Sequence, residues 1–203
     1  ENPERIFNVG AMGIDRIKKI SLLPKKKVEE KIGLNLSKKS LLITFHPVTL
    51  EQKNNEKYID IILNSLNKLE NINLIFTGAN ADSGGEIIND KILKFVNKNK
   101  YRSTFIISMG TLLYLSTLKY VDGVLGNSSS GLVEAPSFKI GTINIGNRQQ
   151  GRAKSSSVID CKVNEKDILD AVEILYSKKF RSTLDSVINP YSKEKTAEKI
   201  IKI

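Results

Sequence analysis

Asp122-Gly-Val-Leu-Gly-Asn-Ser-Ser-Ser-Gly-Leu-Val-Glu134 is the stretch of the sequence that decides the fold. Its apolar beginning, Asp122 to Leu125, predicts a strand, and its end has helical spacing, so the small residues between them predict a tight strand-to-helix loop. Such a loop lets a ligand approach the backbone, and free amides at a helix start together with three serine hydroxyls suit a phosphate. Glu134, further into the predicted helix, could accept hydrogen bonds from sugar hydroxyls. A serine-capped turn without a ligand explains the stretch equally well by itself.

Strands and helices alternate along the rest of the chain. Apolar or β-branched runs predict strands at 41–45, 73–77, 104–108, 123–126, 142–145 and 158–161. Helical spacing recurs at 58–69, 87–96, 112–118 and 168–175, with Asn164 as the N-cap of the last of these and a basic helix from about Ser192 onward. The segment 5–23 is predicted as a strand, a loop and a helix. This alternation predicts an α/β fold with a Rossmann-like parallel sheet and helices on both faces.

Length and composition indicate a soluble globular protein. The chain has 203 residues, 40% of them hydrophobic and 27% charged, which is enough for one domain with a real core. No apolar run approaches the length of a membrane span, and no signal peptide is visible. Cys161 is the only cysteine, so a reducing cytoplasmic location fits, and its apolar surroundings indicate a core residue.

The net charge of +10 raises the question of nucleic-acid binding. The basic residues are mostly dispersed lysines, and the short clusters at 25–27 and 178–179 carry no interleaved aromatic residues. A solvated surface is therefore favoured over a nucleic-acid interface. A non-catalytic nucleic-acid-binding module stays open as an alternative.

Polar residues follow five of the predicted strands. They lie at 46–47, 78–85, 108–111, 126–130 and 146–152, and they include glycines, hydroxyls, two arginines and the only histidine. The carboxyl ends of parallel strands lie at one edge of a sheet, where ligands of such folds bind. The agreement in position predicts a nucleotide or another phosphate ligand at this edge.

Within these loops, single residues can be assigned candidate roles. His46 ends a strand and is restricted by Pro47, so it could donate to a phosphate or to a leaving group, although a structural role is also open. Arg148 and Arg152 could bind a diphosphate, with a solvated loop as the alternative. Asn80 could reach a ribose or a phosphate. With one histidine and one cysteine, the sequence does not predict a metal site.

The order of these motifs resembles a known family. Phe-His-Pro-Val-Thr at 45–49, Asn-Ala-Asp-Ser-Gly at 80–84, Gly-Asn-Ser-Ser at 126–129 and Asn-Arg-Gln-Gln-Gly-Arg at 147–152 are similar to motifs of the UDP-N-acetylglucosamine 2-epimerases. The chain resembles the C-terminal half of the hydrolysing branch, which serves sialic or legionaminic acid precursor synthesis. The similarity spans nearly the whole chain.

The resemblance implies a two-domain, glycosyltransferase-B-like enzyme with the nucleotide sugar between two Rossmann-like halves. It implies that this half holds UDP and that His46 assists the departure of the leaving group. The residues it assigns to UDP or its phosphates are His46, Asn80, Met109 through its backbone, Ser128, Ser129, Arg148 and, as a second candidate, Arg152. Glu134 would bind the ribose.

The family's reaction removes the proton at C2 of the sugar, expels UDP and adds water to give N-acetylmannosamine. The carboxylates that transfer these protons lie in the N-terminal half of the family. Because the sequence begins at Glu1 without a methionine, we expect 1–203 to be a single nucleotide-sugar-binding domain of a longer protein. We expect it to bind UDP weakly and to turn over nothing alone.

The expected partners are UDP or UDP-N-acetylglucosamine, the N-terminal domain and a second copy in a homodimer, with no cofactor, no membrane and no nucleic acid. Two alternatives remain within nucleotide binding: the donor-binding domain of a glycosyltransferase and a nucleotide sensor without catalysis. The sequence does not distinguish UDP from GDP sugars.

Overall fold

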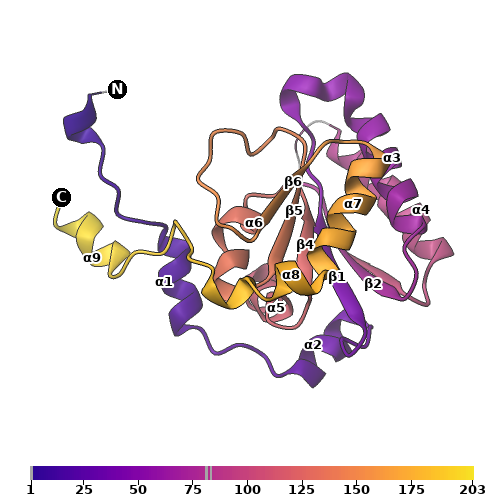
Figure 1. Cartoon of the computed structure of the whole chain (residues 1–203), viewed down its shortest axis with the longest axis horizontal. Helices are drawn as coiled ribbons and strands as arrows, with labels where there is room; N and C mark the ends of the chain where they lie inside the picture. The colour runs from indigo at the N-terminus through magenta and orange to yellow at the C-terminus, as the bar shows by residue number, and fades with distance from the viewer. Residues whose placement is uncertain (1, 81, 83) are drawn as a thin grey trace.

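A computed structural model describes residues 2–80, 82 and 84–203, and its centre is a six-stranded parallel sheet (Figure 1). The strands are β1 (Lys39–Thr44), β2 (Ile72–Thr77), β3 (Ser103–Ile106), β4 (Gly123–Gly126), β5 (Gly141–Ile145) and β6 (Val158–Cys161). Their order is β3-β2-β1-β4-β5-β6, and every neighbouring pair is parallel. This is the Rossmann order, in which the chain changes direction between β1 and β4. The predicted fold class is confirmed, and only the third strand ends clearly early, at Ile106.

Helices cover both faces of the sheet (Figure 1). One face packs against α3 (Asn55–Asn67), α4 (Gly85–Lys98) and α7 (Glu165–Tyr176). The other packs against α2 (Lys25–Ile32), α5 (Gly110–Leu118) and the short α6 (Ser130–Val133) with the 3-10 helix η3 (Ala135–Phe138). Successive residues of β1 alternate between the two cores: Leu41 and Ile43 belong to the first and Leu42 to the second. The predicted arrangement, a sheet with helices on both faces, is therefore present.

The helix α7 forms as its sequence predicts. The side chain of Asn164 accepts a hydrogen bond from the N–H of Asp167, and the predicted apolar face, 168 to 175, is buried. The helix α5 departs from its predicted face. Leu115 and Leu118 are buried, but Leu112 is 40% exposed because the first turn of α5 lies at the rim of a cleft and not over the core.

The chain ends differ from the prediction. The segment 6–11 is not a strand: it follows the 3-10 helix η1 (Pro3–Arg5), pairs with no strand of the described sheet, and leads into α1 (Met12–Lys19). Its partner is the C-terminal segment, since the N–H of Ala11 donates to the carbonyl of Tyr191. The last helix, α9 (Thr196–Ile201), begins later than predicted and packs against α1, so both ends project from one side of the domain (Figure 1).

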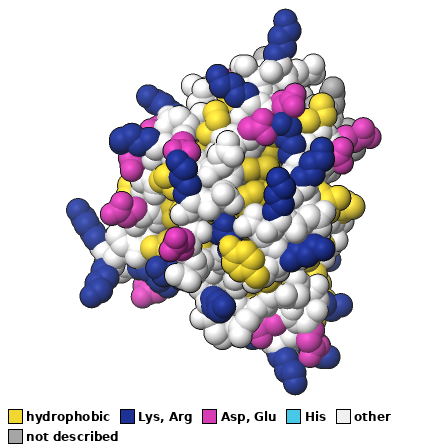
Figure 2. Space-filling model, turned by 90° about the vertical axis from the view of Figure 1, so that its right-hand side faces the viewer, with side chains coloured by type: hydrophobic (Ala, Val, Ile, Leu, Met, Phe, Trp, Pro, Cys, Tyr) yellow, Lys and Arg dark blue, Asp and Glu magenta, His cyan; other side chains and the backbone are white. Residues whose placement is uncertain are grey.

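The surface carries mixed charges on the face shown in Figure 2, where lysines and arginines are scattered among acidic side chains. The remaining short helices are η2 (Thr49–Asn54), α8 (Lys178–Arg181) and η4 (Leu184–Ser186). Among the helices of the described residues, none has the length and apolarity needed to cross a membrane. Cys161 packs against the core as predicted, and burial raises the pKa of its thiol to about 12.

Candidate functional site

A cleft of about 360 Å³ opens at the carboxyl edge of the sheet, between the ends of β1, β2 and β4. It is lined by Thr44, His46, Thr77, Gly78, Met109, Gly110, Thr111, Tyr114, Leu115, Ser128, Ser130 and Glu134. Four residues predicted from the sequence are among these: His46, Met109, Ser128 and Glu134. The prediction that separate loops converge at one edge is thereby met for these four.

The other predicted site residues lie around the cleft. Ser129 is the N-cap residue of α6, and Asn80 and Arg148 bond to the loops of His46 and the serines. Arg152 is exposed in the loop after β5, and its main-chain N–H donates to the carbonyl of Gln149. Ala81 and Ser83 of the motif at 80–84 lie outside the described residues.

The serine turn begins at Gly126, whose φ of +139° directs the chain away from the sheet. The N–H of Asn127 donates to the carbonyl of Thr44, and the N–H of Ser130 donates to the hydroxyl of Ser128. Within the described part of the chain, the amides of Ser128 and Ser129 have no hydrogen-bond acceptor. These two amides are available to a ligand.

The helix after this turn is shorter than predicted, and Glu134 therefore ends α6 instead of lying within it. Pro136 is the reason, because it has no N–H to donate to Leu132 and cannot continue the α-helix. Burial raises the pKa of Glu134, and a hydrogen bond from Ser130 partly opposes this shift.

Tyr114 is a cleft residue that the sequence analysis missed. Its hydroxyl donates to that of Ser130 over 2.7 Å, and burial raises its pKa to about 12, so it stays protonated. Tyr114 thereby connects α5 to Ser130 and Glu134. The helical pattern of α5 could not have revealed this contact, because Tyr114 falls between the leucines that define the predicted face.

The imidazole of His46 is held in one tautomer. The N–H of Asn80 donates to Nδ1 over 3.1 Å, so the proton of the neutral ring lies on Nε2. Burial lowers the pKa of His46 below 6.5, Arg148 lowers it further, and the opposing effects of Asp82 and Asn80 are smaller. At neutral pH the ring is an uncharged donor.

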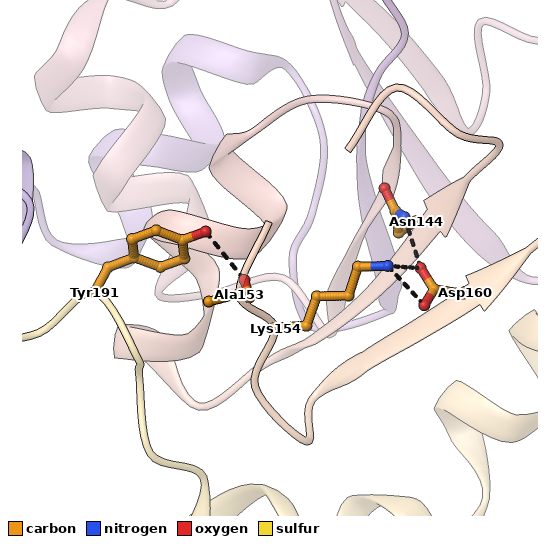
Figure 3. Close-up of polar contacts among 5 residues, drawn as sticks. All are labelled: Asn144, Ala153, Lys154, Asp160 and Tyr191. Carbon is orange, nitrogen blue, oxygen red and sulfur yellow. Dashed lines mark hydrogen bonds and ion pairs between the residues drawn. The ribbon is translucent and has the colours of Figure 1, made fainter. Parts of the chain in front are cut away.

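The arginine loop, residues 146–157, is anchored at both ends. Arg148 Nη1 and Gln149 Nε2 both donate to the carbonyl of Asn127, over 3.2 and 2.7 Å. At the far end, Lys154 pairs with Asp160 (Figure 3). The sequence motif around Gln149 does not predict this contact, because its spacing does not show that the side chain is only 1% exposed.

Two further contacts support the far end of the arginine loop (Figure 3). The amide of Asn144 donates to the carboxylate of Asp160, and the hydroxyl of Tyr191 donates to the carbonyl of Ala153. Burial acts to raise the pKa of Asp160, but the bonds from Lys154 and Asn144 outweigh it and the pKa is lowered.

The cleft therefore combines an imidazole N–H, hydroxyls and free amides, with a guanidinium close by. These groups suit an anionic ligand rather than a cation. Among the described residues, no three or more histidine, cysteine, aspartate or glutamate side chains are grouped to hold a metal ion.

The strand order and the cleft at the carboxyl edge place the chain in the class of Rossmann-like α/β domains. Residues 1–203 match the family model of UDP-N-acetylglucosamine 2-epimerase. The chain belongs to the UDP-N-acetylglucosamine 2-epimerase family.

Similar proteins include a GDP/UDP-N,N'-diacetylbacillosamine 2-epimerase (hydrolysing) of Campylobacter jejuni, 41% identical over 89% of this chain and 47% of that protein. Polysialic acid biosynthesis protein P7 of Escherichia coli is 39% identical over 100% of this chain and 51% of its own length. The chain thus spans about half the length of these relatives. The fold resembles the crystal structure of UDP-GlcNAc 2-epimerase from Neisseria meningitidis bound to UDP-GlcNAc, with a TM-score of 0.74, 16% identity and coverage of 96% and 53% of the two chains.

Proposed function

We propose that this chain binds the nucleoside diphosphate portion of a nucleotide sugar, with UDP as the expected nucleotide. One observation supports this above the others: His46, the serine turn and Glu134 line one cleft, beside Arg148. The neutral imidazole and the free amides provide donors for phosphate oxygens, and the guanidinium supplies charge. The name of one relative includes both GDP and UDP, so the titration described below compares the two bases.

Each predicted site residue has a role in this proposal. Ser128 and Ser129 bind the diphosphate through their amides and hydroxyls, and Arg148, with Arg152 as a second candidate, stabilises its charge. The roles for the remaining groups are contact with UDP by Asn80 and the backbone of Met109, ribose binding by Glu134, and donation by His46 to the oxygen that leaves with UDP.

The whole protein, in this proposal, is a hydrolysing 2-epimerase that converts UDP-N-acetylglucosamine and water to N-acetylmannosamine and UDP. The 41% identity to a relative named as a hydrolysing 2-epimerase supports the type of reaction, and the name of that relative gives N,N'-diacetylbacillosamine as its sugar. Residues 1–203 form the nucleotide-sugar-binding half, and an N-terminal half with its own Rossmann-like fold supplies the proton-transferring groups. A cytoplasmic homodimer is the expected assembly.

Calorimetric titration with UDP, GDP and their N-acetylglucosamine conjugates tests the binding step. Hydrogen bonds to charged groups contribute about 1.5–3 kcal/mol each, so a Ser128→Ala/Ser129→Ala variant should bind UDP at least about tenfold more weakly. A Ser182→Ala/Ser186→Ala variant, changed at two exposed serines away from the cleft, is the matched control. Equal UDP affinity in both variants, or salt-dependent RNA binding without UDP binding, would contradict the proposal.

A further inference from the structure

Asn127 is fully buried at the centre of the site, with 0% of its surface exposed. Its side chain bonds to both main-chain polar groups of His46: Oδ1 accepts from the N–H over 2.7 Å, and Nδ2 donates to the carbonyl over 2.8 Å. The donor and the acceptor of His46 fix the orientation of the amide. Through these two bonds, the N–H and the carbonyl of His46 each have a partner.

These two bonds extend the sheet beyond its last backbone pair. The β1–β4 ladder ends at Thr44 and Gly126, and the N–H of Asn127 still reaches the carbonyl of Thr44. The positive φ of Gly126 turns the chain away from β1, so the β4 backbone does not pair with His46. The amide side chain of Asn127 provides the next donor and acceptor, as a neighbouring strand would, and so holds His46 in line with β1.

The main chain of Asn127 binds the arginine loop at the same time. Its carbonyl accepts from Arg148 Nη1 over 3.2 Å and from Gln149 Nε2 over 2.7 Å. Asn127 therefore bonds directly to His46 and to the arginine loop.

We propose that Asn127 is a positioning residue that holds His46 and Arg148 at the spacing required by the two ends of a diphosphate. The binding part of this inference rests on the proposed function. The geometric part, the coupling of the two loops through Asn127, is independent of any ligand.

The asparagine side chain provides both a donor and an acceptor at a length that reaches the two main-chain groups of His46. Aspartate would accept from His46 but could not donate to its carbonyl, and it would bury a charge. Serine is too short to reach both groups, and leucine has neither a donor nor an acceptor. Because the loss of these bonds also affects folding, the test needs a control that removes a buried amide elsewhere.

The test measures the pKa of His46 by NMR and the affinity for UDP by calorimetry in four proteins: the natural chain, Asn127→Ser, Asn73→Ser and Gln149→Met. Asn73 is 5% exposed, and its amide donates to the carbonyl of Asn35. It lies at the amino end of β2, far along the strand from the cleft. The Asn73→Ser variant, which also removes a buried amide, is therefore a matched control for stability.

In Asn127→Ser, the His46 pKa should rise toward its ordinary value of about 6.5, and UDP should bind at least about tenfold more weakly. Gln149→Met should change both quantities in the same direction by less, and Asn73→Ser should change neither. A folded Asn127→Ser protein with the His46 pKa and UDP affinity of the natural chain would overturn the proposal.

The proposal remains testable if Asn127→Ser does not fold or if the natural chain does not bind UDP. If Asn127→Ser does not fold, Gln149→Met decides, and unchanged values in that variant would overturn the proposal. If the natural chain does not bind UDP, the proposed function fails, but the His46 pKa still tests the coupling of the two loops.

Discussion

At the scale of single residues, His46 offers a direct probe of the cleft, because it is the only histidine in the chain. Its ring signals in an NMR spectrum can be followed without ambiguity as the pH changes. Burial and Arg148 both disfavour the charged ring. The hydrogen bond from Asn80 to Nδ1 places the proton on Nε2, and this tautomer is visible in the nitrogen chemical shifts.

We predict that Arg148→Gln raises the pKa of His46, because one of the two effects that lower it is removed. A ring with a lowered pKa stays neutral in the folded protein while the unfolded chain takes up a proton. Its contribution to stability is therefore complete above about pH 6.5 and is lost as the pH falls through the folded-state pKa. The Arg148→Gln protein should lose less stability over that range.

Arg152→Gln is the matched control for this pKa, since it changes the same loop and the same charge. A pKa that rises equally in both variants would show a general charge effect instead of a local one. Denaturation by urea at several pH values measures the stability part.

At the scale of elements, the sequence predicts the repeated strand-helix units well, because burial on alternate faces leaves clear periodic patterns. The capped helix α7 and the strand-loop-helix unit around Gly126 are examples. The same patterns fail where a contact joins distant segments. The bonds of Tyr114 to Ser130, of Gln149 to Asn127 and of Tyr191 to Ala153 depend on the fold, and nothing local encodes them.

Gly126 should be the glycine that tolerates substitution least. A Cβ at this position would collide with the carbonyl of Thr44, in a backbone conformation that L-residues rarely adopt. We predict that Gly126→Ala costs more than about 3 kcal/mol of stability or abolishes folding. Gly33→Ala, where φ is +74° and nothing lies within 4 Å of the added carbon, should cost only about 1 kcal/mol. Equal urea midpoints for the two variants would contradict the tight approach of β4 to β1.

A separate prediction concerns the ion pair that anchors the arginine loop. Lys154→Met removes the ion pair with Asp160, so the pKa of Asp160 should rise and amide hydrogen exchange of residues 146–157 should become faster. Lys166→Met is the control, because it removes a comparable pair with Asp170 on α7, away from this loop. Mass spectrometry of exchange measures both variants. Unchanged exchange in the Lys154→Met loop would show that the pair does not anchor it.

At the scale of the whole molecule, segments near the two chain ends lie beside the site, whereas the terminal helices η1 and α9 project from the domain (Figure 1). The N-terminal segment pairs with Tyr191, and Tyr191 bonds to the arginine loop. On α1, a Cβ added at Gly13 would lie 3.9 Å from Oε1 of Glu134. Segments near both chain ends therefore approach the site: Gly13 lies near Glu134, and Tyr191 supports the arginine loop.

The chain alone should bind UDP but release none from UDP-N-acetylglucosamine above the uncatalysed background. Its cleft offers a neutral imidazole and a half-buried carboxyl group, and the proposal assigns the proton transfer at C2 to the other half of the protein. NMR analysis of the sugar products after long incubation is the measurement, and a His46→Ala chain controls for contaminating enzymes. Under the proposed function, a longer protein that contains this chain should yield free N-acetylmannosamine, whereas a glycosidic product would indicate a glycosyltransferase. Release of UDP by the natural 203-residue chain but not by His46→Ala would contradict this division of labour, because the catalytic groups would then lie within the described domain.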